Sequence, residues 1–362
     1  MEEIEELRTK INKIDKSIVD LIEKRAKIAK SIGELKQKLN LGIYQPGREK
    51  EVIDHIKEEI KSIPPESVEA IWVEIMSACK VVQGKKSRVC FLGPEGTFTE
   101  IAAKKFFPKA GSIFVAVPNK KAVFNKVEGN YADFGIVPIE NSLEGSVRET
   151  LDLLIEYNLK IYGEVEIRIV HNLIAKKDAK LSDIKTIVSH PQALAQCNRW
   201  LLSNLPNAEL INTSSTARAV EMVAENKKKD MAAIGTKEAA KIHKLECIAS
   251  GIEDNTQNYT RFFVISKNEN IPTDNDKTTM IFVTKHVPGA LFSVIKIFAE
   301  SDINLIKIES RPRKKDLWEY IFIIEFEGNY KDLEKTLKKV EQHTVFMKIL
   351  GSYPKSSKRK FK

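Results

Sequence analysis

The sequence lacks the features that mark secreted, membrane-spanning and metal-binding proteins. Its four cysteines form no C-x-x-C pair and have no histidine at ligand spacing: Cys79, Cys90, Cys197 and Cys247. This scatter predicts reduced thiols in a cytoplasmic protein without a metal site. No apolar run approaches the ~20 residues of a membrane span. The acidic, amphipathic residues 1–7 do not form a signal peptide.

The sequence also lacks the signatures of nucleic-acid and nucleotide binding. Its net charge is +9, but five positive residues lie within positions 355–362, a basic tail of a kind that is usually solvated. No zinc-finger spacing and no aromatic RNA-binding motif accompany this charge. The glycine-rich stretch 93–99 lacks the Lys-Ser/Thr ending of a phosphate-binding P-loop. We therefore expect neither a nucleic acid nor a membrane as a partner.

The sequence does contain three successive patterns of hydrophobicity. At 362 residues the chain is too long for one ordinary core. Polar stretches at 84–87 and 274–277 separate the patterns, which predict domains over 1–86, 87–267 and 277–354. The first pattern is all-helical, the second alternates strands and helices, and the third combines both in a smaller α+β domain.

The first pattern is a heptad seam over roughly forty residues, which is typical of one long helix. At ~1.5 Å per residue this helix spans on the order of 55 Å, too long for a small domain unless another helix lies along it. The seam consists of Ile4, Leu7, Ile11, Ile14, Ile18, Leu21, Ile28, Ile32, Leu35 and Leu39.

Arg25 interrupts this seam where a hydrophobic residue is expected. A guanidinium on an apolar face is unfavourable unless an anion meets it. Lys36 lies about three turns, or ~16 Å, away on nearly the same face, so the two cations could hold a small dianion. Arg8 is ~42 Å from Lys36 and could join that site only from a second copy of the helix. The alternative is a coiled-coil hairpin whose basic side chains snorkel to solvent.

A second helix opens at Arg48-Glu49, and a third follows Pro64-Pro65. Five motifs in these helices resemble the all-helical chorismate mutases, which are dimers whose long first helices interlock. The motifs are Leu7-Arg8, Glu23-Lys-Arg25, Gly33-Glu-Leu-Lys36, Tyr44-x-Pro-x-Arg48-Glu49 and Ile75-Met-Ser-Ala-Cys79-x-x-x-Gln83.

Chorismate mutases convert chorismate to prephenate by a pericyclic rearrangement, which needs a held conformer and well-placed positive charge. The resemblance implies that three arginines grip carboxylates, namely Arg25, Arg48 and, from a second copy, Arg8. It implies that Lys36 and Gln83 bond the ether oxygen and that Glu49 bonds the substrate hydroxyl. Gln45 and Cys79 stand where some members have Asp and Ser, and we expect these two residues to adjust substrate affinity.

The second pattern consists of short apolar strands that alternate with helices. It predicts a parallel α/β fold in two lobes, with ligand at the strand ends. Strands are expected over 89–92, 113–117, 134–137, 187–188 and 231–234. Helices are expected near 100–107, 120–128, 147–157, 191–204 and 216–226.

Within this domain, the polar run 255–261 leads directly into strand-forming residues 262–265. Thr260 and Arg261 would then lie at the mouth of a sheet, unless the run is an ordinary polar loop. With the polar or glycine-rich segments 93–99, 137–146, 189–192, 213–217 and 233–236, this run resembles the prephenate dehydratases across the whole domain.

Prephenate dehydratases remove CO₂ and water from prephenate, so the departing hydroxide needs a proton donor. The resemblance nominates Thr260 as this donor, assisted by a hydrogen-bonded relay or a water. Arg261 either holds a substrate carboxylate or is structural. Glu140 and His190 are acid–base candidates, although a histidine before proline is more often a cap. Supporting donors are expected from Thr97, Asn141, Ser189 and Gln192.

A two-lobed solute-binding module is the alternative for this domain, because that architecture also closes on small anions. A pure binder would keep its function after Thr260→Ala, and the enzyme would not.

The third pattern runs strand, helix, strand, strand, helix, strand, an order typical of a ferredoxin-like fold. Motifs at 287–292, 303–305 and 309–312 resemble the ACT domains found beside prephenate dehydratases. The resemblance implies feedback binding of L-phenylalanine between paired domains. The residues implied are Gly289, Ala290, Leu291, Asn304, Leu305, Glu309, Ser310 and Arg311. A dimerisation domain without a ligand is the alternative.

The three resemblances together are those of bifunctional chorismate mutase/prephenate dehydratases, and they leave only the basic tail unmatched. The expected ligands are chorismate, prephenate and L-phenylalanine, and the expected assembly is a homodimer or a higher homo-oligomer. No metal or organic cofactor is expected. The alternative is an amino-acid or small-anion sensor or scaffold with decayed catalytic domains. Against it stands the intact set of expected site residues, namely Arg8, Arg25, Lys36, Arg48, Glu49, Gln83 and Thr260.

Overall fold

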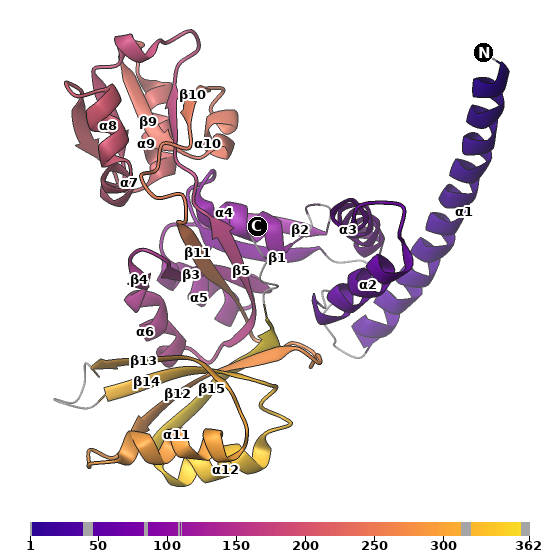
Figure 1. Ribbon diagram of the computed structural model, residues 1–362, viewed down its shortest axis with the longest axis vertical. Coiled ribbons are helices and arrows are strands. Elements are labelled where there is room, and N and C mark those ends of the chain that lie inside the picture. Colours follow the sequence, from indigo (N-terminus) through magenta and orange to yellow (C-terminus); the bar gives the residue numbers. More distant parts are fainter. Residues whose placement is uncertain are drawn as a thin grey trace. The chain divides into compact units, whose positions relative to one another are not determined.

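The computed structural model describes residues 2–38, 46–82, 86–107, 109, 111–312 and 320–355. It divides the chain into two compact units, one of residues 1–88 with 107–113 and one of residues 89–106 with 114–362. Figure 1 shows the helices and strands of both units. Within the described ranges, no helix is both long and apolar enough to cross a membrane.

The first unit contains helices α1 (Glu2–Lys38), α2 (Pro46–Glu59) and α3 (Pro65–Val81). Helix α1 has acidic residues in its first turn and lysines in its last turn, which suits the helix dipole. Helices α2 and α3 both begin with proline, whose missing N–H leaves no hydrogen bond unmade at that position. The long first helix predicted from the heptad seam is therefore present.

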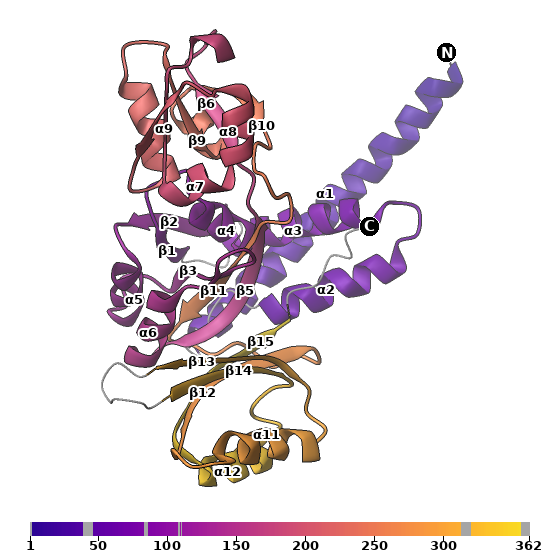
Figure 2. The same ribbon diagram turned by 60° about the vertical axis from the view of Figure 1, so that its left-hand side comes forward.

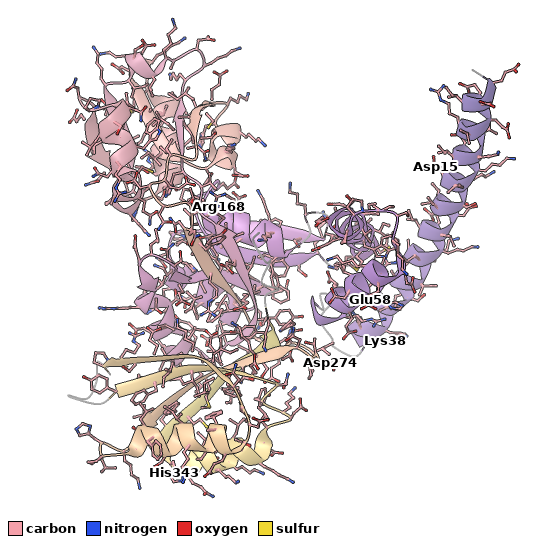
Figure 3. The ribbon with its side chains drawn as sticks, viewed as in Figure 1. Asp15, Lys38, Glu58, Arg168, Asp274 and His343 are labelled. Carbon is pink, nitrogen blue, oxygen red and sulfur yellow. The ribbon has the colours of Figure 1, made fainter. Side chains whose placement is uncertain are left out.

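The apolar seam of α1 faces solvent in the single chain. Each residue from Glu2 to Leu21 is exposed, and Figure 3 shows the side chains of this stretch around Asp15. Farther along the seam, Ile28 is 64% exposed, whereas Ala29 beside it is buried within the unit. A helix with so long an exposed apolar stripe offers a surface to another helix.

The second unit begins with a mixed sheet, here called the first lobe, in the order β2-β1-β3-β11-β5, with β4 beside β3. Strand β1 runs parallel to β3, and β11 runs antiparallel to both β3 and β5. The strands are β1 (Ser87–Leu92), β2 (Ser112–Val117), β3 (Phe134–Asn141), β4 (Gly145–Ser146), β5 (Lys160–Arg168) and β11 (Tyr259–Ser266). Helices α4 (Phe98–Phe106), α5 (Lys120–Glu128) and α6 (Arg148–Glu156) accompany them.

The antiparallel course of β11 corrects the expectation of a parallel sheet. The chain returns to the first lobe from the second, so β11 enters at the end where β1 and β3 leave. The first residues of β11 therefore lie beside the last residues of β3, and Thr260 pairs with Asn141. A polar run that precedes a strand thus still reaches the edge where ligands bind.

A second mixed sheet, here called the second lobe, has the order β10-β6-β9-β7-β8. Its strands are β6 (Asn172–Ala175), β7 (Thr186–Ser189), β8 (Glu209–Asn212), β9 (Met231–Gly235) and β10 (Glu246–Ser250). Its helices are η1 (Leu181–Asp183), α7 (Pro191–Gln196), α8 (Asn198–Asn204), α9 (Thr216–Glu225) and α10 (Lys237–Ile242). The single helix expected near 191–204 is broken at Cys197, which has φ −116° and ends α7.

The chain passes between the two lobes through 169–171 and 251–258 (Figure 2). Arg168, labelled in Figure 3, ties these two segments together. Its Nε donates to the carbonyl of Thr256 at 3.1 Å, and its guanidinium lies 3.5 Å from the buried carboxylate of Glu253. The two lobes are therefore joined by a short, hydrogen-bonded pair of segments.

The C-terminal domain is an antiparallel sheet in the order β13-β14-β12-β15. It comprises β12 (Asp276–Thr284), α11 (Ala290–Glu300), β13 (Leu305–Pro312), β14 (Tyr320–Glu327), α12 (Glu334–Gln342) and β15 (Thr344–Pro354). Apolar residues on one face, such as Phe282 and Phe326, pack with the helices. Residues of the other face, such as Ile281 and Tyr353, share the core of the first lobe with Phe263.

The polar stretch 274–277 is only in part the linker that the sequence predicted. Asp276 and Lys277 belong to β12 and are 3% and 6% exposed. The carboxylate of Asp276 accepts hydrogen bonds from Thr273 and Asn329. Lys277 is paired with two buried carboxylates. From the sequence alone these charged residues are assigned to a linker, because the partners that allow a charge to be buried lie far away in the sequence.

Candidate active sites

A cavity of about 630 Å³ lies between the two lobes of the second unit. Residues at the ends of strands and at the starts of helices line it. The strands are β1, β3 and β11, and the helices are α4 and α9, whose N-termini lie at the cavity. Helix N-termini present N–H donors and positive potential, so the cavity favours an anionic ligand. Its polar lining includes Thr97, Asn141, His171, His190, Gln192, Gln196, Ser215 and Thr260.

Thr260 is held in this cavity by Asn141. Its Oγ1 accepts a hydrogen bond from Asn141 Nδ2 at 2.9 Å. The orientation of this amide is fixed, because Asn141 Oδ1 accepts the backbone N–H groups of Leu143 and Glu144. Thr260 is 9% exposed. Since its oxygen already accepts from an amide, its own O–H is directed to a different acceptor, and a cavity ligand can fill that role.

A chain of side chains continues behind Asn141. Asn141 Nδ2 also donates to Asn258 Oδ1 at 2.8 Å, and Asn258 Nδ2 donates to Gln196 Oε1 at 2.9 Å. Gln196 Oε1 in turn lies 2.9 Å from His171 Nε2. Burial lowers the pKa of His171, with its Gln196 bond and the charge of Glu253 opposing. A neutral His171 therefore donates through Nε2 to Gln196.

Sequence reasoning missed three members of this chain: Asn258, Gln196 and His171. Asn258 lies in the polar run 255–261, which was a usable signal. Gln196 and His171 lie on other elements, α7 and the crossing before β6, and nothing in their local sequence connects them to Thr260. Their juxtaposition arises from the way the lobes close on each other.

The other residues predicted for this site divide into two groups. Thr97 and Gln192 line the cavity with Asn141 and Thr260. Ser189 is fully buried behind it and donates to the carbonyl of Ile234 at 2.8 Å. His190 lines the cavity and caps α7 by accepting from the backbone N–H of Gln192, as the alternative interpretation of this histidine expected.

Arg261 points away from the cavity. Residues alternate across a strand, so the neighbour of Thr260 emerges on the opposite face of the sheet. There the Arg261 guanidinium contacts the carboxylates of Glu140, Glu164 and Glu325. Its expected role as a holder of a substrate carboxylate does not fit this position, and a structural role does.

A second cavity, of about 520 Å³, lies among the helices of the first unit. It brings together four predicted residues of α1 and α2, Arg25, Lys36, Arg48 and Glu49, together with Cys79 of α3. Its remaining lining is Ile28, Ala29, Ile32, Val52, Met76 and Lys80. Cationic side chains thus outnumber the carboxylate in an otherwise apolar pocket, which suits a dianion.

Lys80 was not predicted, although it follows Met76 by one helical turn. Its ammonium forms an ion pair with Glu49, and its side chain is 11% exposed. Burial lowers the pKa of Lys80, with Glu49 opposing. Burial also lowers the pKa of Lys36, where Glu49 opposes the shift and Lys80 adds to it. An anion that entered this cavity would relieve both shifts.

Arg8 does not line this cavity and pairs with Glu5 on the exposed surface of α1. Gln45 and Gln83 lie outside the residues that the structure describes.

The residues predicted to bind L-phenylalanine are not all brought together in one chain. Gly289, Ala290 and Leu291 line a cavity of about 370 Å³ with Tyr320 and Phe322. Gly289 has φ 80°, a left-handed conformation that favours glycine, and it is the N-cap residue immediately before α11. The remaining predicted residues lie at or along the edge strand β13, away from this cavity: Asn304, Leu305, Glu309, Ser310 and Arg311.

Comparison with known proteins assigns three domains in order. Residues 7–84 match the family model described as chorismate mutase type II, residues 89–270 match prephenate dehydratase, and residues 278–344 match the ACT domain. Over 98% of its length, the chain is 42% identical to 99% of a bifunctional chorismate mutase/prephenate dehydratase of Aquifex aeolicus. It is 41% identical to the corresponding protein of Neisseria gonorrhoeae, over 96% of both chains.

A solved structure resembles a large part of this chain. It is a prephenate dehydratase from Arthrobacter aurescens in complex with L-Phe, 35% identical, with a TM-score of 0.68 over 74% of this chain and 90% of that one. Similarity of this extent, together with the three matched domains in order, shows that the chain belongs to the family of bifunctional chorismate mutase/prephenate dehydratases.

Proposed function

We propose that the protein catalyses two consecutive reactions of L-phenylalanine biosynthesis, chorismate to prephenate and prephenate to phenylpyruvate. The observation that carries the second reaction is the Thr260 hydroxyl in the inter-lobe cavity, with its oxygen bound by Asn141. The observation that carries the first is the cationic, largely apolar cavity of the helical unit. The proposed domain limits are 1–86, 87–267 and 277–354, with a basic tail over 355–362. The free cysteines support a cytoplasmic location.

In the proposed dehydratase reaction, Thr260 donates its proton to the ring hydroxyl as the C–O bond breaks and water leaves, and a water that reaches the cavity afterwards returns a proton to the Thr260 oxygen. The bond to the ring carboxylate breaks at the same time, and its electron pair enters the ring, which becomes aromatic as CO₂ departs. A threonine hydroxyl is a weak acid. Asn141 strengthens it, because an N–H aimed at Oγ1 stabilises the charge that develops there. Gln192 and the N-termini of α4 and α9 line the cavity and are proposed to hold carboxylates, whereas the Thr97 hydroxyl already donates to the carbonyl of Leu92.

In the proposed mutase reaction, no proton or nucleophile is needed, and the pocket acts by binding one conformer of chorismate. Arg25 and Arg48 bind its carboxylates. Lys36 stabilises the charge on the ether oxygen as that bond breaks, and Glu49 accepts from the substrate hydroxyl. Gln83 is proposed to join Lys36, and Gln45 and Cys79 to adjust affinity.

Dimerisation completes this proposal. The exposed seam of α1 requires another helix, and Arg8 lies too far from the cavity to serve it within one chain. We propose that a second copy of the chain supplies both the packing helix and Arg8, in an all-helical domain whose first helices interlock. The assembly is a homodimer or a higher homo-oligomer.

The C-terminal domain is proposed to be a ferredoxin-like ACT sensor that binds L-phenylalanine and inhibits the dehydratase. Its glycine-bounded cavity and its edge strand β13 lie apart in one chain. Pairing of two copies is therefore proposed to unite Gly289, Ala290 and Leu291 of one with Asn304, Leu305, Glu309, Ser310 and Arg311 of the other. The L-Phe complex of the Arthrobacter aurescens relative supports this ligand.

The test is to supply prephenate and follow phenylpyruvate for the wild type, Thr260→Ser and Thr260→Ala. The serine variant keeps the hydroxyl and is expected to retain activity, whereas the alanine variant should lose at least about a hundredfold in kcat. Equal activity of the alanine variant would reject Thr260 as the donor. A folded wild type that binds its ligands without turnover would favour the alternative, a sensor or scaffold.

A further inference from the structure

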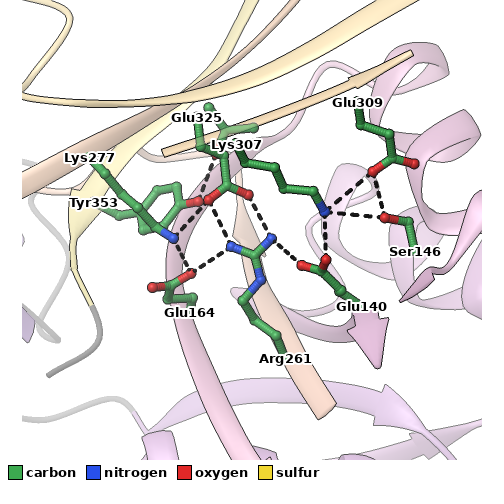
Figure 4. A network of polar contacts seen from close by, with 10 residues as sticks. Glu140, Ser146, Glu164, Arg261, Lys277, Lys307, Glu309, Glu325 and Tyr353 are labelled. Atoms are coloured by element: carbon green, nitrogen blue, oxygen red, sulfur yellow. Dashed lines mark hydrogen bonds and ion pairs between the residues drawn. The ribbon is translucent and has the colours of Figure 1, made fainter. Parts of the chain in front are cut away.

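A buried cluster of charged side chains joins strand β11 to the C-terminal domain (Figure 4). At its centre is Glu325 of β14, which is 2% exposed. The guanidinium of Arg261 donates to both of its oxygens, at 2.6 and 2.8 Å, and Lys277 donates to one of them at 2.9 Å. A bidentate guanidinium–carboxylate pair fixes orientation as well as distance. Glu325 therefore holds Arg261 in one position.

The same cluster connects the first lobe to Arg261. Glu140 of β3 accepts from Arg261 at 2.9 Å, and Glu164 of β5 lies 3.3 Å from it. Lys277 of β12 is 2.7 Å from Glu164. Three neighbouring strands of the first lobe and two strands of the C-terminal domain thus share one ion cluster. Removal of one member leaves a buried charge without its partner, so the cluster resists displacement.

The register of β11 and β3 connects the cluster to the cavity. Thr260 pairs with Asn141, and the next pair along the strands is Arg261 with Glu140. Because side chains alternate, the first pair faces the cavity and the second faces the C-terminal domain. The register shifts immediately after Arg261. A backbone irregularity of this kind changes the direction in which nearby side chains point, and this one lies beside both Arg261 and Thr260. A displacement of Arg261 would therefore also change the direction of Thr260.

The segment beyond Asn141 is held in the same way. Lys307 of β13 lies 2.9 Å from Glu140 and donates to Ser146 at 3.2 Å. Glu309 of the same strand accepts from the Ser146 hydroxyl. The C-terminal domain thus contacts both sides of Asn141 in the sequence, at positions 140 and 146.

Helix α6, which follows this segment, is bound at both ends by the C-terminal domain. Arg311 donates to the carbonyl of Arg148 and pairs with Asp152. Lys348 of β15 donates to the last carbonyls of the helix, those of Leu154, Ile155 and Tyr157, at 2.7 to 3.1 Å. The segment from β3 to β5 therefore takes its position from the C-terminal domain.

We propose that the C-terminal domain is part of the scaffold of the dehydratase site, and that Glu325 sets the position of Thr260 through Arg261. Arg261 is then a positioning residue and not a ligand of the substrate. This inference rests on the proposed dehydratase function and adds to it the physical link by which the C-terminal domain controls the reaction.

The experiment measures kcat and KM for supplied prephenate in the full-length chain with Glu325→Gln. The amide keeps the size of the side chain but removes the charge that orients Arg261. Thr260 is expected to be misplaced, and a shift of ~1 Å can lower a rate about a hundredfold. We expect kcat to fall at least about tenfold while KM stays within about twofold, because the carboxylate-binding groups of the cavity are untouched.

Two control variants separate positioning from general damage. Glu327→Gln removes a carboxylate two residues along the same strand, where Glu327 pairs with Lys355 and not with Arg261. Asp276→Asn removes a second buried carboxylate of the C-terminal domain, whose partners are Thr273 and Asn329 and not Arg261. Both variants are expected to keep kcat within about twofold of the wild type. An equal loss of kcat in Asp276→Asn would overturn the inference, since it would attribute the effect to instability.

A double variant tests whether Glu325 acts through Arg261. In an Arg261→Gln background, Glu325→Gln should cause no further loss of kcat, because residues in one pathway are not additive. Two results would identify Arg261 as a substrate ligand and refute the proposal. One is a double variant whose loss of kcat is the product of the two single losses, and the other is a raised KM in Arg261→Gln alone.

Two further measurements make the result decisive. Circular dichroism and a cooperative urea unfolding transition of each variant report that the chain is folded, and Glu325→Asp, which keeps the charge but shortens the side chain, replaces the amide variant if that one does not fold. An active wild type with unchanged kcat in the Glu325 variant would reject this inference alone. An inactive wild type would reject the proposed dehydratase function itself.

Discussion

At the scale of single residues, each proposed site is built from ordinary side chains whose neighbours change their chemistry. Thr260 is a weak acid by itself, and the Asn141 amide both occupies its lone pair and leaves its proton available. Lys36 is an ordinary ammonium made easier to deprotonate by burial. The partners that cause these changes lie on other helices or strands, so the altered chemistry of each side chain is a property of the fold.

Asn141 offers a test of the proposed proton donor. Asn141→Asp replaces an N–H donor by an acceptor of nearly the same shape, so Thr260 would donate to the new carboxylate and not to the substrate. Asn141→Ala only removes the donor. We expect kcat for prephenate to fall by about two orders of magnitude in the alanine variant and further in the aspartate variant. Leu143→Ala, which shortens a neighbouring side chain that is 43% exposed, is the control, and equal losses in both Asn141 variants would contradict this reasoning.

The pH dependence of the mutase tests the electrostatics of its cavity. Lys36 stabilises negative charge only when protonated, so kcat/KM for chorismate should fall as the pH rises through its pKa, which burial places below 10.5. Lys80→Met removes a cation that lowers the pKa of Lys36. It also releases Glu49 from its ion pair with Lys80, and the charge of Glu49 raises the pKa of Lys36. The alkaline limb should therefore move to higher pH. An unmoved limb, in a variant whose circular dichroism and thermal unfolding match those of the wild type, would exclude Lys36 as the titrating group.

At the scale of helices and strands, local patterns predicted what local forces determine. Helix α5 lies where it was expected, at 120–128, because Asn119 caps it by accepting from the N–H of Ala122. Strands β5, β6, β8 and β10 were missed. Of these, β8 and β10 are short sheet edges with partly exposed side chains and no clear alternation. The direction of β11 and the burial of Lys277 depend on distant partners, which no periodicity reports.

The candidate sites follow the same division. Arg25 and Lys36 could be chosen because they place cations on or near the apolar seam, and Thr260 and Asn141 because their motifs resemble those of prephenate dehydratases. Lys80, His171 and Gln196 could not, because each joins its site only after a helix or a whole lobe has docked. The face on which Arg261 lies was readable in principle from strand alternation, once Thr260 was assigned to the cavity.

The ion cluster between the sheets should make the free energy of unfolding depend on pH in the acidic range. Burial alone raises the pKa of Glu325, but the hydrogen bonds and charges of Arg261 and Lys277 outweigh it and bring the pKa from 4.5 to about 2. The ionised carboxylate therefore stabilises the fold above pH ~4.5, and this contribution, on the order of 3 kcal/mol, is lost as the pH falls towards 2.

Urea unfolding between pH 7 and pH 3 measures this contribution. The difference in unfolding free energy between the wild type and Glu325→Gln should shrink as the pH falls below ~4.5. Glu327→Gln, which alters a side chain that is 45% exposed, is the control and should change the unfolding free energy much less. A difference that stays constant over the whole range would show that Glu325 is not ionised by its partners in the folded chain.

At the scale of the whole molecule, the C-terminal domain is continuous with the dehydratase. Ile281 and Tyr353 share an apolar core with Phe263, and Gly351 approaches the backbone of Ile161 so closely that a Cβ atom would meet its carbonyl oxygen at 2.3 Å. A ligand of the C-terminal domain therefore binds a domain whose sheet packs against the strand that carries Thr260. Such a ligand shifts the dehydratase only as far as it binds two arrangements of this interface differently.

Feedback by L-phenylalanine should consequently pass through Glu325. If this amino acid acts by changing the hold on Arg261, Glu325→Gln removes the connection while leaving the sensor cavity intact. We expect the variant to bind L-phenylalanine in calorimetry with an affinity within about threefold of the wild type. The factor by which saturating L-phenylalanine lowers its remaining kcat/KM should fall to near one. Glu327→Gln should be inhibited like the wild type. Full inhibition of the Glu325 variant would show that the signal reaches the cavity by another contact, such as the Arg311–Asp152 pair on α6.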